Sequence, residues 1–84
     1  MTTKNIELTE QVREIMAATF GIDERELPDD VRQDTLPRWT SLNHMMLLAA
    51  LESHFGLRFS MEEITSVTNL DQIVASLGRH LPRV

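Results

Sequence analysis

The sequence contains no cysteine among its 84 residues. Disulfide bonds, cysteine-ligated zinc and a thiol nucleophile are therefore excluded, and any thiol chemistry would have to come from a group attached to the chain. Histidine occurs at only three positions, which do not have the spacing of metal ligands. We therefore expect no metal site.

Long apolar runs and clusters of basic residues are also missing. No stretch approaches the roughly 18 apolar residues of a membrane span, and the start of the chain has no apolar signal segment, so we expect a cytoplasmic protein without membrane contact. Eight basic residues are scattered among thirteen acidic ones, giving a net charge of −5. This balance argues against nucleic-acid binding and favours a basic partner.

The composition is that of a globular protein, with 42% hydrophobic and 25% charged residues. Internal repeats and low-complexity segments are absent. A chain of this length buries only about 60–65% of its unfolded surface, too little for a deep active-site cavity. We expect a single domain over residues 1–84 that is monomeric and is not itself an enzyme.

Helical periodicity appears in three segments. The first, from Ile6 to Phe20, carries one apolar stripe and is expected to begin at a cap, Asn5 or Thr9, and to end at Gly21. The stripe consists of Val12, Ile15, Met16, Thr19 and Phe20. The last segment follows Thr68 and Asn69, has its apolar residues at Leu70, Ile73, Val74 and Leu77, and is expected to close at Gly78 and Pro82.

The second segment, Ser41 to Phe55, is free of Gly and Pro and is followed by Gly56. Its apolar stripe is too wide for a helix that packs against a single neighbour. One side holds Leu42, Met45, Met46 and Ala49, and the adjoining side holds Leu47, Leu48, Leu51 and Phe55. We expect Leu47, Leu51 and Phe55 in the core, Met45 as core filling, and Met46 on a face that meets partners.

Two further elements complete the prediction. Residues 22–40 read as a long loop attached to the core at single apolar residues, with Trp39 anchoring it on the second helix and an acidic run exposed to solvent. That run is Asp23, Glu24, Glu26, Asp29 and Asp30. Ser60 and Glu63 form the pattern of a capping box that opens a short helix. The fold class is all-α: a small four-helix bundle of three longer helices and one short one, with a long first loop.

A Thr-Ser pair, Thr40 and Ser41, stands at the expected start of the second helix. Either hydroxyl would cap this helix, which is the simplest explanation of such a pair. The N-terminus of a helix also offers free N–H groups and the positive end of the helix dipole. A phosphate joined to the Ser41 hydroxyl would lie in a favourable field there.

The order of these features resembles the acyl carrier protein family. The resemblance covers nearly the whole chain and rests on Ser41-Leu42, on ALESHFG at residues 50–56, on LRFSMEEI at 57–64 and on the closing VTNLDQIVASL at 67–77. It implies a 4′-phosphopantetheine arm on Ser41, attached by a phosphopantetheinyl transferase. It further implies an acyl or aminoacyl group held as a thioester, a loading enzyme and a downstream synthase or transferase.

This sequence departs from that family in two ways. The family usually has Asp directly before the modified serine, where this chain has Thr40, so recognition by a general transferase is open. The second helix of fatty-acid carriers is strongly acidic, whereas here Glu52 is the one acid between Ser41 and Phe55. The partners should therefore be unusual ones. The Trp-x-Ser-Leu-x-His pattern at residues 39–44 resembles stand-alone carriers of polyketide- or peptide-type pathways, which implies a partner face at Thr40, Leu42, His44 and Met46.

Alternatives remain open at this stage. The missing Asp fits an unmodified helical adaptor that keeps the carrier fold and acts through protein contact alone. A minimal hydrolase using Ser41 and His44 has little support, because no acid is evidently placed to orient the imidazole. We expect His44 to face solvent and meet a partner or the arm, and His54 and His80 to be simple surface residues.

Overall fold

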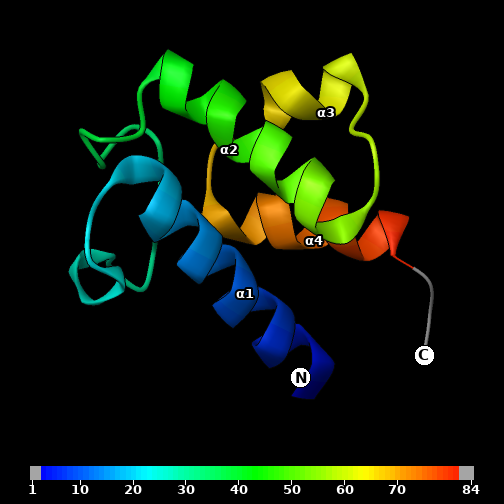
Figure 1. Cartoon of the computed structure of the whole chain (residues 1–84), viewed down its shortest axis with the longest axis horizontal. Helices are drawn as coiled ribbons and strands as arrows, with labels where there is room; N and C mark the ends of the chain where they lie inside the picture. The colour runs from blue at the N-terminus through cyan, green and yellow to red at the C-terminus, as the bar shows by residue number, and fades with distance from the viewer. Residues whose placement is uncertain (1–2, 82–84) are drawn as a thin grey trace.

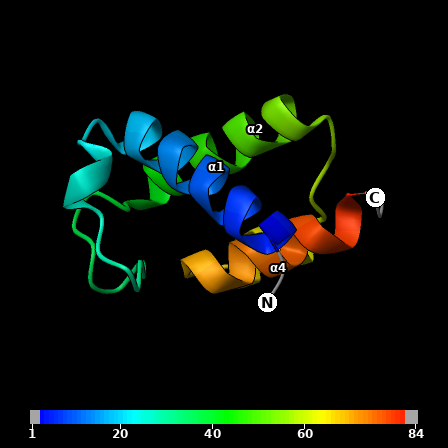
Figure 2. The same ribbon diagram turned by 90° about the horizontal axis from the view of Figure 1, so that it is seen from below.

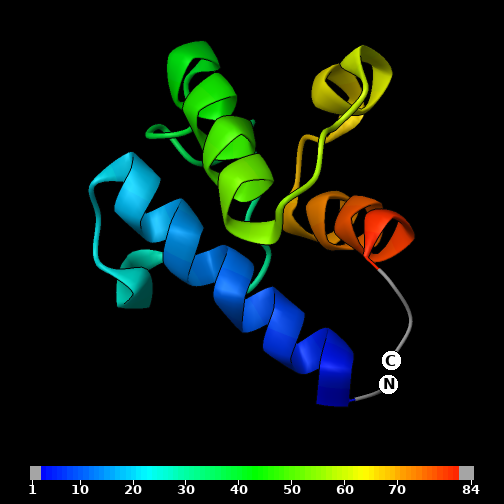
Figure 3. The same cartoon turned by 45° about the vertical axis from the view of Figure 1, so that its right-hand side comes forward.

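The computed structural model describes residues 3–81 and is all-α, as the sequence predicts. Its elements are α1 (Thr3–Phe20), a 3₁₀ turn η1 (Glu24–Glu26), α2 (Ser41–Phe55), α3 (Met61–Ser66) and α4 (Leu70–His80). Helix α1 packs against both α2 and α4, while α3 lies on the side of the bundle away from α1 (Figures 1 and 3).

The core lies where the predicted stripes converge. Val12, Met16 and Phe20 of α1, Leu47 and Leu51 of α2, and Ile73 and Leu77 of α4 are all at most 2% exposed. Phe55 was expected among them but is only partly buried at the edge of this core.

Two predicted helix ends are wrong. Helix α1 begins at Thr3, so Asn5 and Thr9 lie inside it and do not cap it. Gly78 lies inside α4, because the Leu81 N–H still bonds the Leu77 carbonyl and the φ of Gly78 is not positive. Gly21 and Gly56 do adopt the left-handed conformation that ends a helix, with φ of 71° and 67°. The expected stop at Pro82 lies outside the described residues.

The long connection between α1 and α2 gathers at one end of the bundle (Figure 2). Leu27, Val31 and Trp39 are buried, and η1 supplies a short turn, so the prediction of a loop attached at intervals is confirmed. Residues 31–33 also pair with residues 68–70. The Leu70 N–H donates to the Val31 carbonyl and the Gln33 N–H to the Thr68 carbonyl, each at 2.9 Å.

Candidate functional site

Ser41 is the first residue of α2, and its side chain is exposed. Thr40 is the N-cap, because its backbone is extended and its hydroxyl accepts a hydrogen bond from the Asn43 N–H at 3.1 Å. The cap predicted from the Thr-Ser pair therefore falls to Thr40. The Ser41 hydroxyl is therefore not needed to cap α2.

The segment that leads into Ser41 is held in place by hydrogen bonds. The Asn43 side-chain amide donates to the Arg38 carbonyl at 2.7 Å, and the Arg38 guanidinium donates to the Phe20 carbonyl at 3.1 Å. The start of α2 is thereby tied to the end of α1. Ser41 consequently has a fixed position on the bundle although it is exposed.

The first turn of α2 offers unpaired donors beside this serine. The N–H groups of Asn43 and His44 bond the Thr40 hydroxyl and carbonyl. Within residues 3–81, the N–H groups of Ser41 and Leu42 have no acceptor, as expected for the start of a helix. A phosphate ester on the Ser41 hydroxyl is compatible with this donor set and with the positive end of the helix dipole.

Trp39 and His44 form a stacked aromatic pair next to the serine. Trp39 is 3% exposed and contacts Phe20 of α1, with ring centroids 5.7 Å apart, so it anchors the loop on α1 as well as on α2, where the prediction placed it. The Trp39 indole N–H donates to His44 Nδ1 at 3.0 Å, and the two rings stack with centroids 6.0 Å apart. His44 Nε2 lies 2.7 Å from the Ile64 carbonyl of α3.

The expectation that His44 faces solvent is therefore wrong. The imidazole is half-buried, and both ring nitrogens have partners other than Ser41. A nucleophile needs a base within hydrogen-bond reach, so the Ser41–His44 hydrolase has no geometric support. In the described part of the chain, no group of three or more His, Asp or Glu side chains could hold a metal ion.

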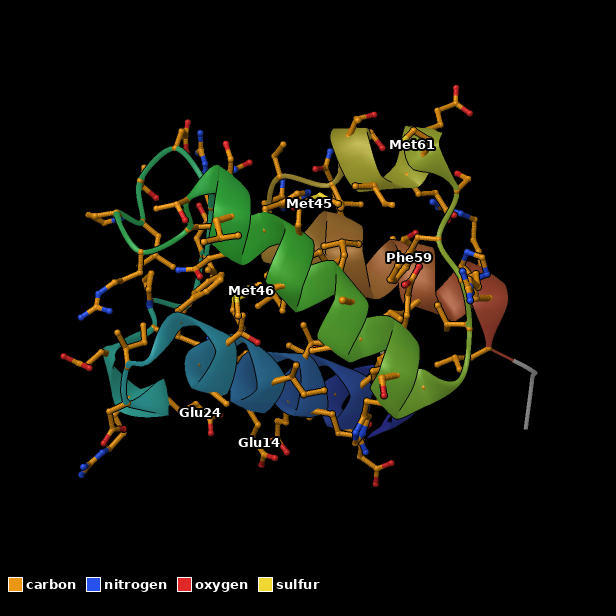
Figure 4. All side chains as sticks on the ribbon, turned by 45° about the horizontal axis from the view of Figure 1, so that its top comes forward. Glu14, Glu24, Met45, Met46, Phe59 and Met61 are labelled. Atoms are coloured by element: carbon orange, nitrogen blue, oxygen red, sulfur yellow. The ribbon has the colours of Figure 1, made fainter. Side chains whose placement is uncertain are left out.

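An apolar face adjoins the serine on α2 and α3. Leu42 is 70% exposed, Met45 52%, Met46 50% and Met61 75%, and these are four of the five large hydrophobic side chains exposed among the described residues. Figure 4 shows Met45 on the α3 side of α2 and Met46 on the α1 side. The prediction of core filling is wrong for Met45, whereas Leu42 and Met46 are exposed as expected. Part of the wide apolar stripe of α2 is therefore exposed to solvent and does not pack in the core.

Helix α2 adds no free acid to this apolar face. Glu52, its one acidic residue, accepts a hydrogen bond from the Phe59 N–H at 2.9 Å and so ties the end of α2 to the connection before α3. His54 is exposed and lies against the edge of Phe55, with ring centroids 4.7 Å apart.

The joint between α3 and α4 was missed by sequence reasoning. Glu63 completes the predicted capping box with Ser60, and its carboxylate also accepts from the Ser76 hydroxyl at 2.7 Å and lies 2.9 Å from His80 Nε2. Ser76 is fully buried, and His80 also packs edge-on against Phe59. His80 is therefore more than a simple surface residue. The capping pattern singled out Glu63, but nothing in the sequence pointed to its partners on α4.

These partners change the acidity of Glu63. The Ser60 N–H, then the Ser76 hydroxyl and His80, stabilise the carboxylate and lower its pKa from 4.5 to about 2. Arg79 adds a longer contact at 4.0 Å. Glu63 therefore holds the α3–α4 joint in its ionised form.

The acidic run of the long loop is exposed as predicted except at Glu24, which is half-buried, and it is partly neutralised within the loop. Asp23 pairs with Arg25 at 3.0 Å, and the Arg25 side chain lowers the pKa of Asp23. Asp34, beyond that run, pairs with Arg32 at 2.9 Å. These are exposed ion pairs, which contribute little to stability.

Over 72 residues, 86% of this chain, the sequence is 36% identical to the non-reducing polyketide synthase stbA of Stachybotrys bisbyi. The chain spans about 3% of the length of that protein. No known family profile matches the chain. Among residues 3–81, none of the helices combines the length and the apolar character that a membrane crossing requires.

Proposed function

We propose that residues 1–84 form one carrier domain that bears a 4′-phosphopantetheine arm on Ser41 and serves a polyketide-type pathway. The observation that carries this proposal is the exposed Ser41 hydroxyl at the start of α2, with Thr40 acting as the cap and unpaired N–H groups beside it. Similarity to a polyketide synthase over most of the chain and the carrier-like order of sequence features support it.

In this proposal the attached arm and the residues around Ser41 have different roles. The arm supplies the thiol that this cysteine-free chain lacks, on which an acyl group is held as a thioester. Thr40 and Asn43 keep the start of α2 fixed, so a transferase meets the serine in one geometry. The chain contributes attachment and presentation, and the chemistry belongs to the enzymes that visit it.

The apolar face at Leu42, Met45, Met46 and Met61 is the proposed contact surface for those enzymes. Exposed apolar clusters of this kind mark protein contacts, and methionine adapts to differently shaped partners. Because Glu52 is the one acidic residue of α2 and is bonded to the Phe59 N–H, we expect docking on α2 to depend mainly on apolar contact.

The decisive experiment is modification with coenzyme A and a broad-specificity phosphopantetheinyl transferase, followed by intact mass measurement. The wild type should gain one arm, and Ser41→Ala should gain none. Ser53→Ala is the matched control, because Ser53 is an exposed serine on the same helix, and it should be modified like the wild type. Modification of Ser41→Ala would refute the assignment. A wild type that stays unmodified here and in its own cell would indicate the unmodified adaptor instead.

A further inference from the structure

Helix α3 is attached to the rest of the molecule by the partly buried Ile64, which packs against the core, and by polar contacts. None of its own residues is fully buried. Two hydrogen-bonded joints hold it: the Glu63 carboxylate meets Ser76 and His80 of α4, and the Ile64 carbonyl meets His44 of α2. The position of α3 beside Ser41 therefore depends on His44.

The two partners of His44 demand one form of the imidazole. The Trp39 indole nitrogen is only a donor, so Nδ1 must present its lone pair. The Ile64 carbonyl is only an acceptor, so Nε2 must carry the proton. Only the neutral ring with its proton on Nε2 satisfies both contacts.

We propose that His44 is a positioning residue that fixes Trp39 and α3 around the first turn of α2, and that it does so only as the neutral ring with its proton on Nε2. A proton on Nδ1 would face the indole N–H across 3.0 Å, which replaces a hydrogen bond with a contact between two donors. The bond from Nε2 to the Ile64 carbonyl would remain, since Nε2 keeps its proton.

The charged groups described around His44 would not stabilise a positive charge on its ring. None of the ion pairs among the described residues involves His44. From α3, the Glu63 carboxylate is turned to α4, and from the loop, the Arg38 guanidinium is bonded to the Phe20 carbonyl. An imidazolium at this site would consequently gain no carboxylate partner.

The first test is the tautomer, read by long-range nitrogen–proton NMR of the histidine rings at about pH 8, where imidazoles are neutral. His44 should show a bare Nδ1 and a protonated Nε2. A proton on Nδ1, or an average of the two forms, would overturn the proposal. This measurement needs no group on Ser41, so its failure is distinct from failure of the carrier assignment.

The second test uses Trp39, the one tryptophan of the chain, as a fluorescent reporter. His44→Phe removes the acceptor of the indole N–H, so the emission of Trp39 should differ from that of the wild type while circular dichroism shows the helices intact. The control variant His54→Phe should emit like the wild type. An emission of His44→Phe that matches the wild type would contradict the hold of His44 on Trp39.

The third test measures the hold on α3. His44→Phe keeps an aromatic ring but offers the Ile64 carbonyl no donor, so the amides of α3 should exchange with solvent about tenfold faster, the equivalent of about one hydrogen bond. Amides in the core of α1 should change much less. His54→Phe, on the exposed side of the same helix, is the control and should leave α3 unchanged. Unchanged α3 exchange in His44→Phe would show that His44 does not position this helix.

Discussion

Replacing Glu63 with alanine should release α3 from α4. The carboxylate accepts from the Ser60 N–H at 2.8 Å, from the Ser76 hydroxyl at 2.7 Å and, with His80 as donor, at 2.9 Å. Hydrogen bonds to a charged group contribute about 1.5–3 kcal/mol each, and the contributions are not additive. The Ser60 and His80 donors are exposed and regain water, whereas the Ser76 hydroxyl is fully buried and does not. We therefore expect Glu63→Ala to lower the free energy of unfolding by about 2–4 kcal/mol.

Three comparison variants separate this joint from a general effect of losing an acid. Glu62→Ala removes the exposed neighbour in the same helix and should cost less than about 0.5 kcal/mol. Ser76→Ala removes the buried hydroxyl together with its need for a partner and should cost about 0.5–1.5 kcal/mol. The double variant lacking both Glu63 and Ser76 should then cost about 1 kcal/mol less than the sum of the single changes.

Urea unfolding at neutral pH, followed by circular dichroism, gives these free energies. Hydrogen exchange should in addition place the largest loss of protection in α3, because that helix has no fully buried residue to hold it otherwise. If Glu63→Ala costs no more than Glu62→Ala, the joint does not stabilise the fold and this reasoning is refuted.

The same joint should appear in the pH dependence of stability. The pKa of Glu63 is lower in the folded protein, at about 2, than its ordinary value of 4.5. The contribution of the Glu63 carboxylate to the free energy of unfolding is therefore complete above the pKa of the unfolded chain. It is lost as the pH falls through the pKa of the folded protein. Glu63→Gln cannot ionise, so its stability should fall less steeply than that of the wild type between about pH 5 and 2. Parallel curves in acid titrations would contradict the assigned role.

Three other predictions concern α2 and its cap. Thr40→Asp should keep the helix capped, add a negative charge near its positive end and speed modification of Ser41 by a general transferase in a timed mass assay; an unchanged rate would mean that Thr40 does not limit recognition. Leu51→Ala, at a fully buried position, should cost about 2–5 kcal/mol in urea, and a smaller loss would misplace the core. Met46→Glu should cost less than about 1 kcal/mol yet weaken acyl loading by the cognate enzyme, because the enzyme would have to desolvate a new charge; a variant that loads normally would move the docking face elsewhere.

Periodicity and capping chemistry predicted most of the fold because both are local. The stripe in α2 and the cap pattern at Ser60 follow from residues within a few positions of one another. The start of α1 was misplaced, since two plausible capping residues lie inside the helix. Gly78 was misread as a stop because glycine permits a left-handed turn without requiring one.

The contacts between distant segments could not be predicted from local periodicity or capping patterns. His44 bonds Ile64 twenty positions away, and Glu63 bonds residues 13 and 17 positions away. A single histidine on an otherwise apolar helix face looks like a solvent-exposed residue until the indole and the carbonyl are both in place. The exposure of Ser41, Leu42 and Met46 was predictable from the helical period, whereas their roles in attachment and docking remain predictions.

The fastening of the chain on either side of α3 has a kinetic consequence. Before this helix, the Phe59 N–H is bonded to Glu52, and after it, the Thr68 carbonyl is bonded to Gln33. When the His44 and Glu63 contacts break and Ile64 leaves the core, the freed segment, residues 59–68, is a loop of about ten residues with both ends fixed. Loops of this length close within about 10–100 ns. Openings of α3 should therefore be brief, so a partner would meet this helix almost always in its closed position.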